Sequence, residues 1–118
     1  MTDYVVMFPA DNEEERAAGT EAERQATFDT DFEFGKLLEA RGGAVTGGAG
    51  LTHSSEARTL KRGSTSRVLV TEGPFAESVE QLSGFFIVTC DDYDALVEAA
   101  RVLTRAHPVV EIRPVKEF

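Results

Sequence analysis

Apolar runs along the chain predict four strands of one sheet. Apolar, β-branched and aromatic residues dominate residues 3–8 and 84–90, which predicts two buried strands. The glycine-rich residues 44–51 predict a weaker strand, whose bare backbone lets a ligand or another backbone approach closely. Residues 109–115 alternate apolar and charged side chains. They predict a fourth strand that lies at an edge or ends near Pro114, because proline cannot donate to a ladder.

A long helix is predicted after the first strand. Thr20 followed by Glu23 fits a capping box, in which each residue satisfies a backbone N–H of the first turn. The helix should end at the glycines at positions 42 and 43, where a left-handed cap costs little. Its apolar face is predicted to comprise Phe28, Phe32, Phe34, Leu37 and Leu38.

A second helix and a hairpin complete the predicted elements. Asp91 or Asp92 is expected to cap a helix that ends before Pro108. Residues 57–60 and 66–71 flank a Lys-Arg-Gly-Ser-Thr turn and predict a β-hairpin.

The order of these elements predicts one α+β domain over residues 1–118. Both helices can cover one face of a largely antiparallel sheet and leave the other face uncovered. Strands rich in Phe, Val and Ile would make that uncovered face an apolar patch, and such patches usually mark association. We therefore expect a homodimer that packs sheet on sheet.

Charge and hydropathy narrow the expected partners. The net charge is −9, and residues 1–41 carry 11 acids against 4 bases. An acidic chain repels phosphate backbones, so no nucleic-acid partner is expected. No apolar run approaches about 18 residues and no signal-peptide pattern begins the chain, so we expect a soluble, cytoplasmic protein without a membrane partner.

Residues that could hold a metal or cofactor are sparse. The chain has two histidines and one cysteine, at no ligand spacing, and Cys90 is expected in the core. The glycines of residues 47–50 are not followed by a Lys-Ser/Thr helix start, so they do not form a phosphate loop. We expect neither a metal nor a cofactor.

The chain carries one long motif. Residues 70–78 read Val-Thr-Glu-Gly-Pro-Phe-Ala-Glu-Ser, and residues 80–85 read Glu-Gln-Leu-Ser-Gly-Phe. This motif resembles the signature of the YCII-related (DGPF-type) family, and residues 110–115 resemble the last strand of that family. The resemblance implies a ferredoxin-like fold of the dimeric α/β-barrel type, with a cleft between sheet and helices. Glu72 stands where the family has aspartate.

The resemblance implies less about activity. Some relatives outside the DGPF branch have a His–Asp pair proposed as catalytic, with the histidine on the first helix. The helix predicted from Thr20 to Arg41 contains no histidine, so that pair cannot be carried over. Members of the branch are often associated with alternative sigma factors, which implies a regulatory context without a mechanism.

No motif in the sequence defines a reaction, and three functions from different classes remain open. The first is small-molecule binding in a cleft near residues 71–80, with a pocket lined by Phe28, Phe32, Thr71, Glu72 and Phe75. The second is an acid–base enzyme of the lyase or isomerase type that uses Glu72 and His53, because a histidine beside a carboxylate can act as a base near neutral pH. The third is a regulatory protein that binds a partner through its acidic N-terminal third.

Structural explanations compete with each candidate site residue. Glu72, Glu77 and Glu80 would perturb one another if buried together, but they can equally point to solvent. The intervening Gly-Pro pair fixes a turn. His53 can be an exposed loop residue, and His107 is expected to have a structural role at the end of the second helix.

Overall fold

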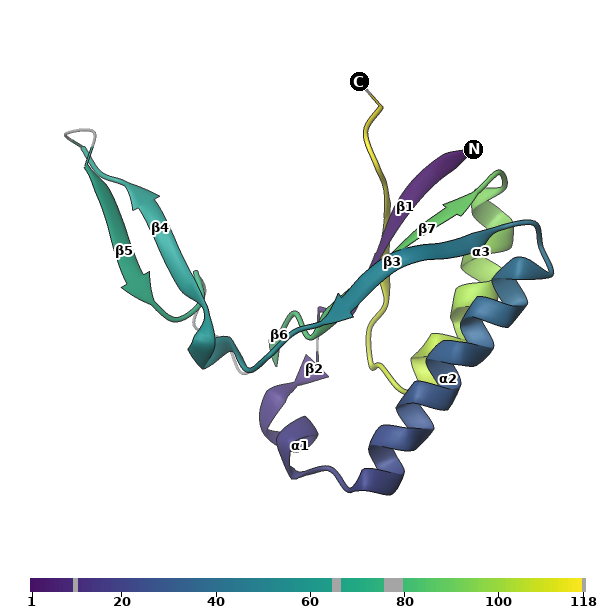
Figure 1. The fold of residues 1–118 in the computed structure, drawn as a ribbon, viewed down its shortest axis with the longest axis horizontal. Coiled ribbons are helices and arrows are strands. Elements are labelled where there is room, and N and C mark those ends of the chain that lie inside the picture. The colour runs from purple at the N-terminus through teal and green to yellow at the C-terminus, as the bar shows by residue number, and fades with distance from the viewer. Residues whose placement is uncertain (10, 65–66, 76–79, 118) are drawn as a thin grey trace.

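The computed structural model describes residues 1–9, 11–64, 67–75 and 80–117, and its centre is a four-stranded antiparallel sheet (Figure 1). The strands lie in the order β3-β7-β1-β8, with bounds β1 (Thr2–Met7), β3 (Ala44–Gly50), β7 (Gly84–Cys90) and β8 (Glu111–Pro114). The four predicted strands and the α+β class are confirmed. Pro114 is the last residue of the edge strand β8, as expected for a residue that cannot donate to a ladder.

Helices cover one face of this sheet (Figure 1). They are α2 (Glu21–Glu39) and α3 (Tyr93–Ala100), the second of which continues as the 3₁₀ helix η2 (Arg101–Arg105). The Thr20 hydroxyl oxygen accepts from the backbone N–H of Glu23 at 3.1 Å, and the Asp92 carboxylate accepts from that of Ala95 at 3.2 Å. Both predicted N-caps are thus confirmed. In the described ranges, no helix combines the length and apolar character needed to cross a membrane.

The remaining elements lie between β1 and α2 and between β3 and β7. They are β2 (Asp11–Asn12), α1 (Glu13–Ala18), η1 (Ser54–Glu56), β4 (Arg58–Arg62), β5 (Val68–Glu72) and β6 (Glu80–Gln81). β2 pairs with β6, and β4 pairs with β5 as the predicted hairpin. This hairpin projects away from the four-stranded sheet (Figure 1). The Cα radius of gyration is accordingly 16.5 Å, whereas a compact domain of this length would have about 13.5 Å.

The core lies between the sheet and the helices. Its fully buried side chains come from α2, α3, η2, β1 and β7 and include Phe34, Leu38, Leu96, Leu103, Val6, Val88 and Cys90. The prediction that Phe28 and Phe32 share the inward face of the helix is wrong, because 65% and 61% of their surfaces are exposed. α2 packs on α3, η2 and β3 through the stripe of Phe34 and Leu38. Phe32 lies two residues from Phe34 and is therefore turned about 200° away around the helix.

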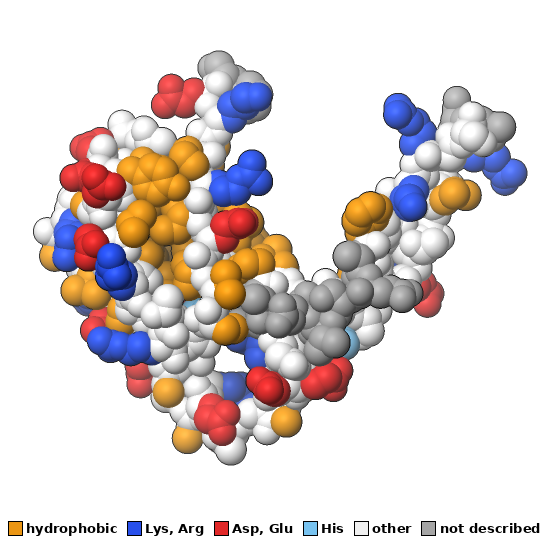
Figure 2. Space-filling view, turned by 180° about the vertical axis from the view of Figure 1, so that it is seen from behind, with side chains coloured by type: hydrophobic (Ala, Val, Ile, Leu, Met, Phe, Trp, Pro, Cys, Tyr) orange, Lys and Arg blue, Asp and Glu red, His pale blue; other side chains and the backbone are white. Residues whose placement is uncertain are grey.

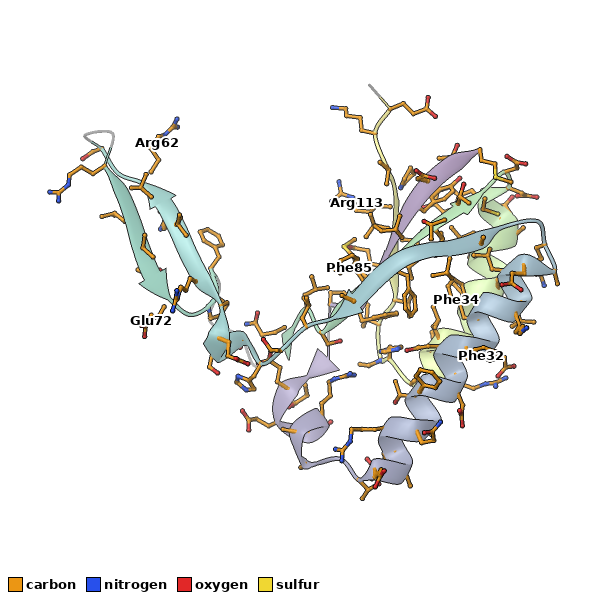
Figure 3. All side chains as sticks on the ribbon, in the orientation of Figure 1. Phe32, Phe34, Arg62, Glu72, Phe85 and Arg113 are labelled. Carbon is orange, nitrogen blue, oxygen red and sulfur yellow. The ribbon has the colours of Figure 1, made fainter. Side chains whose placement is uncertain are left out.

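Within the described residues, the opposite face of the four-stranded sheet has no covering layer (Figure 1). Direct cross-strand pairs place Val5 opposite Ile87, and Met7 and Ala49 opposite Phe85, so these side chains share one face. In Figure 3, Phe85 lies on the side of the sheet that faces the hairpin, whereas Phe34 lies between the sheet and the helices. Apart from Ala49, these apolar side chains are half-buried, and Arg113 and Glu111 of β8 lie beside them opposite Val5 and Met7. The uncovered face therefore carries a partly exposed apolar strip that charged residues border on one side.

Candidate functional site

A pocket of about 520 Å³ opens where β3 and β7 meet α2 and the end of η2. The glycines of β3 form one wall, since Gly47, Gly48 and Gly50 leave the strand backbone without bulk. The opposite wall comes from α2, and the rim includes α1 and the segment before β7. The lining residues are Phe8, Arg16, Thr27, Asp31, Val45, Thr46, Gly47, Gly48, Ala49, Gly50, Ser83, Gly84, Phe85, Phe86 and His107.

The glycine wall has a physical cause at Gly48. A β-bulge between Val45 and Gly47 shifts the pairing of β3 with β7. Gly48 then has a φ of +144°, which side-chain-bearing residues rarely adopt. A Cβ at this position would overlap the carbonyl oxygen of Phe85 and lie 2.9 Å from Cα of Phe86. Glycine is thus needed at position 48 so that β3 can approach β7 closely. Because the glycines of β3 carry no side chains, the space beside the strand stays open as the pocket.

A His–Asp pair with a buried imidazole lies in this pocket. His107 Nε2 lies 3.1 Å from Asp31 Oδ1, within hydrogen-bond distance. The His107 side chain is 3% exposed. The Asp31 side chain is 26% exposed, so its carboxylate reaches the open part of the pocket. The pair joins positions 76 residues apart in the chain. An imidazole held by a carboxylate in a partly closed pocket is an arrangement that can move a proton.

Packing fixes the imidazole of His107. Its ring stacks on Phe8, with centroids 3.7 Å apart and planes 11° from parallel. Phe8 in turn meets Phe86 edge to face at a centroid separation of 5.5 Å. The backbone N–H of His107 donates to the carbonyl of Leu103 at 3.0 Å, so the tight end of η2 determines where the side chain begins.

Asp31 and Arg16 reach the site from different helices. Asp31 lies one turn before the fully buried Phe34 on α2, which places its carboxylate on the edge of the packed face. Arg16 comes from α1, a short helix whose N-terminus is capped by the Asn12 side chain through the N–H groups of Glu14 and Glu15. The pocket therefore combines a cation, a carboxylate and an imidazole within a largely apolar lining.

Two further grooves adjoin the pocket along α2. One, of about 680 Å³, runs between α1 and the first turns of α2 and is also lined by Arg16 and Asp31. The other, of about 300 Å³, passes over Phe28 and Phe32 and shares Asp31 as well. Asp31 thus lies where all three hollows meet.

His53 lies outside all three hollows. Its Nε2 is 3.3 Å from Glu14 Oε1 and 3.4 Å from Glu13 Oε2, and its side chain is 39% exposed. Glu13 also accepts from the backbone N–H of Ser54 at 2.8 Å and from the Ser54 hydroxyl at 2.6 Å. These contacts hold η1 against α1, at the base of the hairpin.

Three other predicted site residues lie on or beside the hairpin. The Thr71 hydroxyl donates to the carbonyl of Thr59 at 3.4 Å, and Glu72 is exposed at the end of β5 (Figure 3). Phe75 is 80% exposed, with Lys61 Nζ 5.5 Å from its ring centroid. Gly73, at a φ of +100°, makes the turn that the Gly-Pro pair predicted.

The predicted site residues form two separate groups within one chain. Phe28 and Phe32 lie on α2, and the hairpin residues Thr71, Glu72 and Phe75 line none of the three hollows. Their assembly into one cleft stays a prediction, as does an acid–base role for Glu72 and His53. Glu77 lies outside the described residues, and only the backbone of Glu80 is described.

Sequence reasoning did not identify the pair of His107 and Asp31. The sequence showed only that His107 lies between the end of the second helix and a proline. That position predicted a structural role for the imidazole. No local pattern relates it to Asp31. Within the described part of the chain, no three His, Cys, Asp or Glu side chains gather closely enough to hold a metal ion.

Comparison with known proteins places the chain in a family. The family model described as the YCII-related domain matches residues 3–118. A protein of Rhizobium meliloti (strain 1021), described as uncharacterized protein R00369, is 39% identical over 69 residues, which cover 56% of this chain. The same match covers 55% of the relative, so the chain spans about half the length of that protein. Since the family model covers nearly the whole sequence, this chain belongs to the YCII-related domain family.

Proposed function

We propose that this chain is a homodimeric protein that binds a small organic molecule in the glycine-walled pocket beside His107 and Asp31. The single observation that supports it most is the buried imidazole held at 3.1 Å by a carboxylate that lines the same pocket. The volume of about 520 Å³ is in the range that small ligands occupy.

The lining favours a flat compound that carries a carbonyl or carboxylate group. Phe8 and Phe86 offer apolar surface to the body of such a ligand. Arg16 places a guanidinium at the rim, and guanidinium groups match carboxylate geometry. Asp31 can accept from a ligand hydroxyl, because its side chain is partly exposed.

The test is a ligand screen with a blocked pocket. Small organic acids and carbonyl compounds are scored for the rise in melting temperature that binding causes, followed by calorimetric titration of the hits. A Cβ on Gly50 would meet no atom within 4 Å. Gly50→Ala should therefore keep binding, whereas Gly50→Leu should fill the pocket and abolish it. The proposal fails if no compound of either class binds, or if hits bind Gly50→Leu with unchanged affinity.

The homodimer in this proposal packs sheet on sheet, with each chain in a ferredoxin-like arrangement. Support comes from the strand order β3-β7-β1-β8 and from the uncovered apolar face around Phe85 and Ile87. Sedimentation equilibrium should give twice the chain mass of 12.8 kDa, and Ile87→Asp should lower the mass towards one chain. A wild-type mass of one chain at micromolar concentration would contradict this part.

Acid–base catalysis in the same pocket is the second candidate, and the His107–Asp31 pair favours it. A base of this kind abstracts a proton next to a carbonyl group. Carbonyl compounds that bind should then exchange that proton for deuterium in heavy water, as followed by NMR. Asp31→Asn should slow the exchange by about tenfold or more. Hits that bind but exchange no faster than in buffer would leave binding as the function.

A regulatory role linked to alternative sigma factors rests on the family resemblance and stays a prediction.

A further inference from the structure

The hairpin of β4 and β5, here called the arm, is poorly supported by its own chain. The two strands pack mainly on one another and extend away from the sheet (Figure 1). Leu60, Val68 and Val70 share one face of the arm by their pairing, and each is 60% or more exposed. A two-stranded hairpin without a covering layer is at best marginally stable in water. Among the described residues no other element covers this apolar face, which favours a cover from a second chain.

A matching surface lies on α2. Phe28 and Phe32 are four residues apart, so they form one stripe, and they line the groove of about 300 Å³. Their exposures of 65% and 61% show that the core of their own chain does not use them. In Figure 3, Phe32 lies on α2, on the far side of the sheet from the arm. One chain thus carries two exposed apolar surfaces that cannot meet each other.

Layer order indicates how two copies bring these surfaces together. An open gap separates the arm from the rest of the molecule (Figure 2), and Phe85 marks the sheet face that lies on this side (Figure 3). A second copy that seats its own uncovered face on this sheet turns its helices outward, because they cover its other face. Those helices then face the arm of the first copy. The second copy's sheet and helices would then form two successive layers between the first copy's sheet and its arm, each about 10 Å from the next.

Charge favours the same contact. Residues 58–72 carry Arg58, Lys61, Arg62 and Arg67 against one acid, Glu72. Residues 13–39, which include α1 and α2, carry nine acids against three bases. Figure 2 shows Lys and Arg side chains gathered on the outer part of the arm. The arm is therefore basic where residues 13–39 are acidic overall, and opposite potentials steer and orient such a contact. Beside Phe32 itself the charge is mixed, since Lys36 Nζ lies 5.3 Å from its ring centroid and Asp31 and Glu39 line the same groove.

We infer that the arm of each copy in the homodimer lies across α2 of the other copy, with Leu60, Val68 and Val70 packed on Phe28 and Phe32. The exchange is reciprocal, so two identical contacts close a twofold dimer. It would bring Glu72, at the base of the same arm face, beside the grooves of the second copy. The inference rests on the sheet-on-sheet dimer of the proposed function and is independent of ligand binding.

Complementation between two variants tests the exchange in trans. The arm variant is Leu60→Asp with Val70→Asp, and the groove variant is Phe28→Gln with Phe32→Gln. All four positions are 60% or more exposed within the chain, so each variant should fold, as circular dichroism can verify. Each variant alone loses both contacts, and its dimer dissociation constant should rise about a hundredfold, since each tenfold step is about 1.4 kcal/mol. A mixture restores one intact contact per mixed dimer, so it should dimerise more tightly than either variant.

Two controls complete the experiment. Val97→Gln removes an apolar side chain that is 39% exposed on α3, and it should leave the dissociation constant unchanged. Raising the salt concentration from about 0.05 M to about 0.5 M should weaken the wild-type dimer, because it screens the contact between basic arm and acidic helix. In the variant Arg58→Gln with Arg62→Gln, this salt dependence should shrink.

The outcomes separate the two proposals. A wild-type chain that is monomeric would overturn the dimer and the exchange together, even if a different protein then bound the arm. A wild-type dimer whose arm and groove variants dimerise normally would overturn the exchange alone. A mixture no tighter than its components would also overturn the exchange, because the arm would then pack within its own chain or on another surface.

Discussion

Substitution of single glycines in β3 tests how closely this strand approaches β7. Gly48 and Gly50 lie two residues apart in one strand and both line the pocket. At Gly48 a Cβ would overlap the Phe85 carbonyl oxygen, and φ is +144°. At Gly50 a Cβ would meet nothing within 4 Å. We expect Gly48→Ala to destabilise the protein strongly and Gly50→Ala to leave stability nearly unchanged.

The expected size of the Gly48→Ala effect follows from two terms. A non-glycine residue forced into this region of φ costs about 1–3 kcal/mol. Relief of the overlap with Phe85 moves β3 away from β7 and weakens adjacent ladder hydrogen bonds, at about 0.5–1.5 kcal/mol each. The free energy of unfolding should therefore fall by about 2–4 kcal/mol. For Gly50→Ala the unfolded chain loses some freedom without strain in the folded state, so the change should lie between zero and a gain of about 1 kcal/mol.

Urea denaturation at a fixed chain concentration measures both changes. Fluorescence of Tyr4 and Tyr93 or circular dichroism follows unfolding, and the slope of free energy against urea verifies that both variants expose similar surface. The chain concentration is held constant because the proposed dimerisation would add to apparent stability. If Gly48→Ala lies within about 0.5 kcal/mol of the wild type, β3 does not approach β7 as described, and the glycine wall of the pocket has another cause.

Three further substitutions test other parts of the fold. Asp31→Ala removes the carboxylate that lies 3.1 Å from the buried imidazole of His107 and should lower the free energy of unfolding by about 1–3 kcal/mol. Asp31→Asn keeps a hydrogen-bonding side chain and should lose less. An equal loss would show that the charge of Asp31, not its hydrogen bond, stabilises the fold. Gly35→Ala adds a methyl group to the interior of α2 with nothing within 4 Å in the same chain. In a chain diluted until it is monomeric, thermal unfolding should show a gain of about 0.5–1 kcal/mol, and a loss would contradict the open space at this position. Thr20→Ala removes the N-cap of α2 and should cost about 1 kcal/mol in urea; Thr27→Ala, inside the same helix, should cost less, and the reverse order would contradict the cap.

Local sequence signals predicted the elements of this fold. The caps at Thr20 and Asp92 and the turn at Gly73 depend on hydrogen bonds and backbone angles within a few residues, so their residue types suffice to place them. The strands around the core depend on runs of apolar residues, and the same runs predicted the uncovered apolar face. The family motif added the expectation of a ferredoxin-like fold.

Tertiary structure decided what the helices and the pocket do. The apolar pattern predicted that Phe28, Phe32 and Phe34 share one inward face of α2. In the structure only the side of the helix that carries Phe34 packs on η2 and β3, so only that side is buried. The pair of His107 and Asp31 joins positions 76 residues apart, and no local pattern can encode such a distance. The sequence by itself thus determined which segments form strands, helices and turns, because short-range interactions control them. Which polar side chains meet, and which aromatic residues stay exposed, depended on the packing of whole elements against one another.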